Sequence, residues 1–440
     1  MAYRESLSSS LIVTGDPAFD PALARWSLGT GKLPPGLSLG TGGVISGTPT
    51  AITSEAGTSF EVVASYKTKA AQQAYMIQVG DDYLEVTQIS AGAQHTCAVL
   101  TSGGVACWGS NTYSQLGTGT SNDSIVPVTL PGLSGIVNVS AGSVHTCAVS
   151  NSGALYCWGY NGQGQAGQDK SIVTIPTPMA VDGSGFKSVD LGSRHSCALK
   201  LNGELYCWGQ GSLGSLGTGF RTSFTTPTLV AGPVSTVTAF STGEYHTCAI
   251  SGGALYCWGF NASGQLGAAE GNTSNLLTPM RVSGLDSGVT DVATGSNHTC
   301  AVHNGEAKCW GAGGNGRLGD GTVTTRHVPA AGVTGLGNGV TKVSAGSAFS
   351  CAVKNGEVWC WGENSAGQLA QGSTSAGSLV PVRAAQVGSS EVTDITLGDI
   401  FACVRQAGLA KCWGGNEAGQ LGNGTTETRS LPVGVQPIQD

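Results

Sequence analysis

The sequence predicts an all-β fold: a seven-bladed β-propeller preceded by a small immunoglobulin-like β-sandwich. Three observations lead to this prediction. A motif exemplified by residues 140–167, SAGSVHTCAVSNSGALYCWGYNGQGQAG, occurs seven times in order. The tryptophans of its CWG step recur every 50 to 52 residues. Residues 1–82 contain neither the motif nor a cysteine. Two domains are therefore expected, at 1–82 and 83–440.

Each copy of the motif is expected to supply one blade. In the second copy, residues 136–142, 145–150 and 154–159 predict three short strands, and a fourth follows near Pro178. Self-similarity at such a period is typical of propellers, solenoids and arrays. Alternating apolar residues and a total of 70 glycines exclude stacked helix pairs. Four strands in each of seven units is the pattern of a seven-bladed propeller.

A proline follows the long loop in every unit. Because proline cannot donate to a central ladder, the strand that carries it is expected at an outer edge, or the proline marks a strand start. These prolines are Pro127, Pro178, Pro227, Pro279, Pro329, Pro381 and Pro432.

The N-terminal 82 residues have the pattern of a small β-sandwich. Short alternating runs such as SFEVVASY (59–66), proline and glycine turns about every 8–12 residues, and a last strand candidate that closes at Gly80 give this pattern. The segments KLPPGLSL (32–39) and GGVISGTPT (42–50) resemble the immunoglobulin-like, cadherin-like modules of bacterial and phage surface proteins. The resemblance covers residues 7–80 and implies a spacer or an adhesive stalk.

The repeat itself resembles that of the regulator of chromosome condensation family. The shared pattern is GxxHTCAV…GxxYCWGxNxxGQLGxG, and it covers residues 84–440. The resemblance implies a seven-bladed ring. How the ring is closed stays open, and one candidate is an N-terminal strand that completes the last blade.

All fourteen cysteines lie in the repeats, two in each unit. Counting outward from the intervening turn places the two cysteines of a unit directly opposite each other on adjacent strands, about 4.5 Å apart between Cα atoms. We therefore predict seven disulfides within blades and no metal site, since zinc sites favour closer clusters. Buried free thiols in a cytosolic protein are the alternative. The predicted pairs are Cys97 with Cys107, Cys147 with Cys157, Cys197 with Cys207, Cys248 with Cys257, Cys300 with Cys309, Cys351 with Cys360, and Cys403 with Cys412.

Two further residue types recur in register, and both are expected to be structural. Sevenfold recurrence favours packing between blades for the CWG tryptophans. The family resemblance implies that the histidines satisfy backbone groups between blades, and Phe349 and Phe401 at their position in units six and seven argue against a histidine metal ring. The tryptophans are Trp108, Trp158, Trp208, Trp258, Trp310, Trp361 and Trp413; the histidines are His95, His145, His195, His246 and His298.

Composition and motifs limit the function. Charged residues make up 11% of the chain and the net charge is −7, which excludes binding to nucleic acid phosphates. No apolar run is long enough to span a membrane, and residues 1–19 lack a secretory signal. No nucleophile elbow, P-loop, HExxH motif or recurring carboxylate pair is present. We expect no enzymatic activity, no catalytic residue and no cofactor.

The leading expectation is therefore a structural or recognition protein. It would be exposed on a phage virion, as a tail, fibre or decoration component, or on a bacterial surface, because disulfides favour an oxidising environment. Its partners would be other virion or surface subunits or a host receptor, bound through variable loops; the oligomeric state, a homo-oligomer included, stays open. The alternatives are a secreted inhibitor of an enzyme and a regulator of the guanine nucleotide exchange type. The loops are 118–126, 168–177, 218–226, 268–278 and 370–380.

Overall fold

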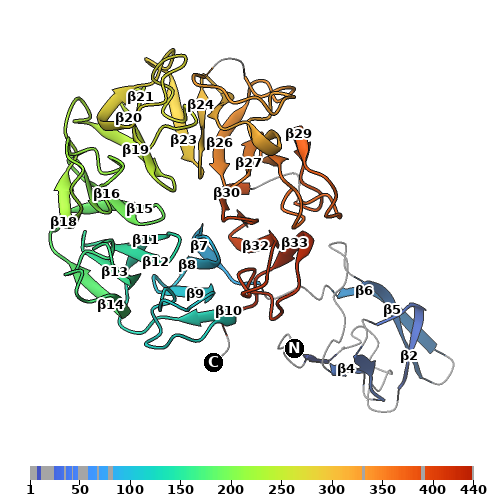
Figure 1. Ribbon diagram of the computed structural model, residues 1–440. Helices are drawn as coiled ribbons and strands as arrows, with labels where there is room; N and C mark the ends of the chain where they lie inside the picture. Colours follow the sequence, from blue (N-terminus) through green and yellow to red (C-terminus); the bar gives the residue numbers. More distant parts are fainter. Residues whose placement is uncertain are drawn as a thin grey trace. The chain divides into compact units, whose positions relative to one another are not determined.

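A computed structural model describes residues 7–10, 24–33, 36–41, 43–47, 58–66, 69–77, 83–329, 332–387 and 392–438. The chain divides into two compact units, 1–82 and 83–440. Both units consist of strands, which confirms the predicted all-β fold (Figure 1).

The first unit contains two antiparallel sheets of three strands each. Phe60 and Val62 of one sheet and Ile45 of the other form one buried cluster, which Trp26 and Leu37 pack against. Each sheet thus turns an apolar face to the other, as in a β-sandwich. The end of the segment GGVISGTPT, residues 48–50, and the strand end expected at Gly80 lie outside the described residues. One sheet has the order β1 (Leu7–Ser10), β4 (Val44–Gly47), β3 (Leu37–Leu39); the other has β2 (Arg25–Gly31), β5 (Thr58–Tyr66), β6 (Lys69–Ile77).

The second unit is a seven-bladed propeller, as predicted. Each repeat forms one antiparallel sheet whose strands follow the chain order outward from the centre of the ring (Figure 1). The first strands contact one another from blade to blade and therefore lie innermost. They are β7 (Val86–Ala91), β11 (Ile136–Ala141), β15 (Phe186–Leu191), β19 (Val237–Thr242), β23 (Val289–Thr294), β26 (Val340–Ala345) and β30 (Val392–Leu397).

The second and third strands of each blade form a hairpin that is almost fully buried, because neighbouring blades cover both of its faces. The second strands are β8 (His95–Leu100), β12 (His145–Ser150), β16 (His195–Lys200), β20 (His246–Ser251), β24 (His298–His303), β27 (Phe349–Lys354) and β31 (Phe401–Gln406). The third strands are β9 (Val105–Gly109), β13 (Leu155–Tyr160), β17 (Leu205–Gly209), β21 (Ala254–Gly259), β25 (Glu306–Gly311), β28 (Glu357–Gly362) and β32 (Leu409–Gly414).

The proline-bearing strands lie at the outer edge, as the sequence predicts. In each of them a register shift surrounds the proline, for example between Ser378 and Val382 around Pro381, so the missing N–H interrupts no regular ladder. In the described part of the fifth unit, a single bridge between Gly311 and Arg326 stands in the place of this strand, and a short 3-10 turn, η2 (Gly314–Gly316), opens the preceding loop. The outer strands are β10 (Ser124–Thr129), β14 (Thr174–Val181), β18 (Phe224–Leu229), β22 (Leu276–Arg281), β29 (Ser378–Arg383) and β33 (Arg429–Gly434).

Strand alternation gives the ring two distinct faces. The tight turns between second and third strands and the connections between blades lie on one face, which we call the hairpin face. The turns between first and second strands and the long loops between third and fourth strands lie on the other, which we call the loop face. In the last four units the hairpin turns have two residues, both with positive φ, such as Asn355 (52°) and Gly356 (80°). Positive φ at both central residues is the pattern of a type I′ turn.

The ring closes by hydrogen bonds between the two ends of the repeat region. Leu84 N donates to Val435 O at 3.0 Å, Ala410 N donates to Leu84 O at 3.0 Å, and Val86 N donates to Gly408 O at 2.8 Å. Bonds equivalent to that between Val86 N and Gly408 O also join consecutive blades elsewhere in the ring. The first and last blades each draw all four strands from their own repeat, and none of the described N-terminal strands completes the last blade.

Candidate functional site

The structure joins the fourteen cysteines in the seven predicted pairs, each between the second and third strands of one blade. The register places Cys147 opposite Cys157, and the two Cα atoms of every pair lie 4.1 Å apart. All fourteen side chains are buried. Seven disulfides within blades indicate a protein that works in an oxidising environment. The bonds join Cys97 to Cys107, Cys147 to Cys157, Cys197 to Cys207, Cys248 to Cys257, Cys300 to Cys309, Cys351 to Cys360, and Cys403 to Cys412.

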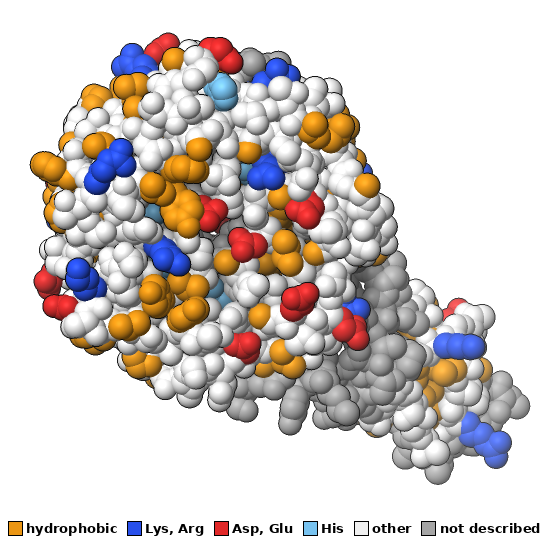
Figure 2. Space-filling model, viewed as in Figure 1, with side chains coloured by type: hydrophobic (Ala, Val, Ile, Leu, Met, Phe, Trp, Pro, Cys, Tyr) orange, Lys and Arg blue, Asp and Glu red, His pale blue; other side chains and the backbone are white. Residues whose placement is uncertain are grey.

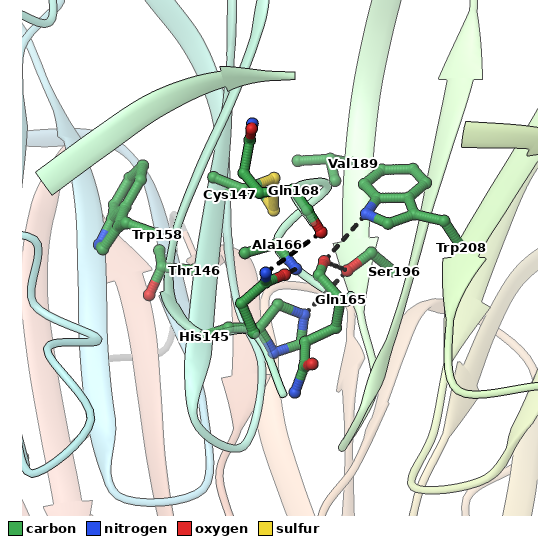
Figure 3. Close-up of a disulfide and its surroundings, with 12 residues drawn as sticks. His145, Thr146, Cys147, Trp158, Gln165, Ala166, Gln168, Val189, Ser196 and Trp208 are labelled. Carbon is green, nitrogen blue, oxygen red and sulfur yellow. Dashed lines mark hydrogen bonds between the residues drawn. A yellow bond between two sulfur atoms is a disulfide. The ribbon is translucent and has the colours of Figure 1, made fainter. Parts of the chain in front are cut away.

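A hydrogen-bonded cluster connects each blade to the next, and Figure 3 shows it between the second and third blades. His145 Nε2 lies 2.8 Å from Ser196 Oγ. Ser196 Oγ donates to the backbone carbonyl of Gln165 at 2.7 Å, and Trp208 Nε1 donates to the same carbonyl at 2.9 Å. The second blade thus supplies the histidine and the carbonyl, and the third supplies the hydroxyl and the indole. We call this cluster the blade latch.

The indole–carbonyl bond of the latch occurs at all seven junctions. The closing junction has it too, since Trp108 of the first blade donates to Gln420 O of the last at 2.9 Å. Glycine leaves room for five of the indoles: a Cβ on Gly117, for example, would lie 2.7 Å from Trp158 Nε1. The seven bonds run from Trp108 to Gln420, Trp158 to Gln115, Trp208 to Gln165, Trp258 to Ser215, Trp310 to Gln265, Trp361 to Arg317 and Trp413 to Gln368.

The latch fixes the protonation state of its histidines. The single hydrogen of the Ser196 hydroxyl is used on the Gln165 carbonyl, so the hydrogen between Ser196 and His145 belongs to His145 Nε2. Burial lowers the pKa of His145 to about 3 and that of His195 to about 4. A neutral ring with its proton on Nε2 is therefore the state at neutral pH.

The histidine contact differs from the expected one. The ring binds a side-chain hydroxyl of the next blade, and that hydroxyl reaches the backbone. The serine or threonine that directly follows this position in six of the seven units is thus a latch residue, which sequence analysis did not single out. The five contacts are His95 with Thr146, His145 with Ser196, His195 with Thr247, His246 with Thr299 and His298 with Ser350.

The two phenylalanines that replace histidine are fully buried at the same place. After Phe349, the next blade carries Ala402 where the others carry a hydroxyl, so this junction has lost both polar partners together. After Phe401, Thr96 keeps its hydroxyl bond to Gln420 O at 2.8 Å. The buried phenylalanines can pack between blades, but they cannot bind a metal ion. The histidine positions therefore do not form a continuous ring of metal ligands.

Buried asparagines organise the long loops, another role that sequence analysis missed. Asn161 Oδ1 accepts from Ala166 N at 3.0 Å, and Asn161 Nδ2 donates to the carbonyls of Gln168, Asp169 and Ile172. The recurring N of WGxNxxGQLG was the available signal. The equivalent residues are Asn111, Asn261, Asn364 and Asn416.

The loop face carries two aromatic pairs. The Tyr113 and Tyr160 rings lie 5.3 Å apart, centroid to centroid, in an edge-to-face arrangement, and the Tyr245 and Phe260 rings lie 6.3 Å apart. Phe220, in a neighbouring long loop, is 63% exposed. Paired aromatics beside an exposed ring are typical of protein-binding surfaces.

A cavity of about 300 Å³ opens where the central channel meets the loop face. Seven turns line it, one from each blade between its first and second strands. Glu244 and Asp399 are the charged residues of this lining. Figure 2, viewed as in Figure 1, shows acidic, basic and hydrophobic side chains around the central opening of a face that is otherwise mostly uncharged.

Among the residues that the structure describes, no three His, Cys, Asp or Glu side chains are grouped so that they could hold a metal ion. The described part of the chain also contains no helix of the length and apolar character that a membrane span requires.

Family models match both units. The family model described as RCC1-like domain matches residues 65–402, and the one described as "Putative Ig domain" matches residues 2–80. The Arabidopsis thaliana ultraviolet-B receptor UVR8 is 31% identical over 208 residues, which are 46% of this chain and 47% of the relative. Human E3 ubiquitin-protein ligase HERC2 is 33% identical over 156 residues, 34% of this chain and 3% of the relative. This chain thus spans half or less of these relatives.

Solved structures agree on the fold. Human WBSCR16 superimposes with a TM-score of 0.68 at 21% identity, covering 76% of this chain and 96% of that one. Yeast RCC1 (Prp20), solved bound to Kap60, gives 0.65 at 20% identity, covering 80% and 85%. Because the RCC1-like model matches well over half of the sequence, this chain belongs to the RCC1-like domain family.

Proposed function

We propose that this protein is a non-enzymatic recognition protein that binds protein partners through its loop face. The proposal is supported by the placement of both aromatic pairs, Tyr113–Tyr160 and Tyr245–Phe260, on the face into which the cavity opens. The latches and disulfides hold the blades rigidly, so the loops are presented on a preorganised scaffold, which reduces the entropy cost of binding.

We further propose that the protein is displayed on a phage particle or a bacterial surface, with the immunoglobulin-like unit as its base. The seven disulfides, the 11% content of charged residues and the adhesin-type N-terminal module support this placement. Antibodies against the propeller should label intact particles or cells without permeabilisation. Labelling that requires lysis, with free thiols on the extracted protein, would contradict the placement.

The binding face is tested with a random peptide display library selected against the full oxidised protein. Selected peptides should lose binding to the loop-face variant Y113S/Y160S. They should keep binding to a matched hairpin-face variant, V137S/L201S, which removes side chains that are 54% and 76% exposed. Circular dichroism melts establish that both variants are folded. Peptides that depend on the hairpin-face residues and ignore the loop-face residues would overturn the proposal.

A further inference from the structure

We propose that the cavity at the loop-face end of the channel, together with the Tyr245–Phe260 pair at its rim, receives a basic side chain that projects from the protein partner. This inference rests on the proposed function, because it names the chemistry of the partner at the same face.

The cavity, with a volume of about 300 Å³, has room for a long side chain and is formed entirely by short turns. Apart from the two acidic residues and Leu191 and Leu397, its lining consists of glycine, alanine, serine and threonine, as in Gly142-Ser143. Glycine is required here, because a Cβ on Gly142 would lie 2.7 Å from Gly192 O and 2.9 Å from the His145 ring. The latches therefore hold the cavity open in a fixed shape, and no long side chain of the lining fills it.

The charge of the lining is acidic. Glu244 belongs to the fourth blade and Asp399 to the seventh, so they reach the cavity from opposite parts of the ring. No ion pair links either of them to a cation among the described residues. Desolvation among the turns, with the Glu244 charge adding to it, raises the pKa of Asp399 to about 6. A positive group placed between the two carboxylates would relieve this repulsion.

The backbone of the lining offers acceptors and few donors. The N–H groups of Ala93, Ser143, Glu244 and Asp399 donate to carbonyls of the neighbouring turn at 3.2 to 3.4 Å, so these donors are in use. Each carbonyl oxygen has a second lone pair. The chain itself uses one lining carbonyl for a guanidinium: Arg317 Nη1 donates to Ser347 O at 2.9 Å. Arginine or lysine of a partner has donors and no acceptors, which complements such a lining.

The Tyr245–Phe260 pair also favours a basic side chain in the cavity. Tyr245 follows Glu244 in the sequence, and its ring contacts Phe260, so aromatic surface borders the acidic cavity. A cation that enters beside aromatic rings gains cation–π attraction, and its aliphatic stem packs on them. Arg194 is exposed on the adjacent turn. Because its positive charge repels further cations, the favoured partner presents a single basic residue rather than a basic cluster.

The test uses the full oxidised protein and a fluorescein-labelled cyclic peptide, cyclo(Gly-Ser-Tyr-Arg-Ser-Gly), with citrulline in place of arginine as a neutral probe of the same shape. Fluorescence anisotropy should show at least about tenfold tighter binding of the arginine peptide to the wild type. E244Q/D399N should abolish this preference. The control E270Q/E417Q makes the same change in charge at exposed loop-face positions outside the cavity lining and should retain it.

Equal affinity for the two peptides, or no binding of either up to about 10 mM, would overturn the inference. Loss of the arginine preference in the control variant as well would show general attraction to an acidic surface, and it would overturn the inference too. The proposed function is tested separately. Display-selected peptides that need Tyr113 and Tyr160 but show no preference for a basic residue would keep the loop face as the binding face. They would refute only the inference that the cavity receives a basic side chain.

Discussion

His145 Nε2 and Ser196 Oγ, 51 residues apart in the sequence, lie 2.8 Å apart and are both fully buried. The imidazole donates to the hydroxyl, and together the two side chains connect one blade to the next. The junction between the sixth and seventh blades shows the apolar alternative, with Phe349 and Ala402 at the corresponding positions.

This pairing predicts strong coupling between the two latch residues. S196A leaves the His145 N–H buried without an acceptor, at a cost of about 1–3 kcal/mol, and H145F leaves the hydroxyl without its donor. The double variant H145F/S196A, which copies the sixth junction, should cost less than the sum of the two single changes by about 1–2 kcal/mol. Urea unfolding of all four proteins measures the cycle. Additive losses would show that the two side chains act independently.

The buried histidines predict a loss of stability in mild acid. The pKa of His145 is about 3 in the folded chain against an ordinary 6.5, so unfolding takes up a proton between these values and stability falls as pH falls through that range. Burial raises the pKa of Asp291 and Asp399 to about 6, which opposes the effect because the folded state then takes up protons.

The contribution of His145 to the pH dependence of stability can be separated from the opposing effect of the two aspartates. H145F/S196A should reduce the pH slope of the unfolding free energy by one proton, about 1.4 kcal/mol per pH unit between about pH 4 and pH 6. Unfolding curves at several pH values, compared with the wild type, give the difference directly. An unchanged slope would mean that His145 is protonated in the folded protein.

The latch carbonyls differ in the number of side-chain donors that they accept from. The same Trp→Phe substitution should therefore lower the free energy of unfolding by different amounts at different junctions. Gln115 O accepts from both Trp158 and Thr146, whereas Gln368 O accepts from Trp413 alone because Ala402 has no hydroxyl. W413F should therefore destabilise the protein by about 1–2 kcal/mol more than W158F, since it leaves a buried carbonyl without a side-chain donor. Chemical denaturation compares the two. Equal losses would assign the role of the tryptophans to packing alone.

Each disulfide is expected to make a moderate contribution to the free energy of unfolding. Removing one with C147A/C157A should cost about 2–3 kcal/mol, less if the hairpin persists in the unfolded chain. The intact mass of the untreated protein should lie two hydrogens per disulfide below that of the reduced protein, with no thiol open to alkylation. Alkylation of all fourteen cysteines in protein from its native source would contradict an oxidising location.

The last hairpin turn predicts a stabilising substitution. Ala407 has a φ of 50°, a left-handed conformation that the corresponding turns give to asparagine or glycine. A407N should raise stability by about 1 kcal/mol, and the reverse change N355A should lower it by a similar amount. Thermal melts measure both. A destabilised A407N would show that the turn is not limited by backbone strain.

The sequence by itself determined the blades and their disulfides. Strand order, outer prolines, hairpin turns and cysteine register all follow from residues near one another in the chain, because a tight turn fixes which residues face each other across a hairpin. The seven tryptophans were also assigned to the boundaries between blades for the right reason, their recurrence.

Tertiary structure alone decided the contacts between repeats. The latch joins His145 to a hydroxyl of the next repeat, the ring closes through Leu84 and Val435, and the cavity brings Glu244 and Asp399 together from blades three repeats apart. Local pattern gives no information on such pairings, because they depend on the angle between packed sheets and on the number of blades that close the ring. The acidic residues appeared scattered in the sequence because only closure of the ring places them around one opening.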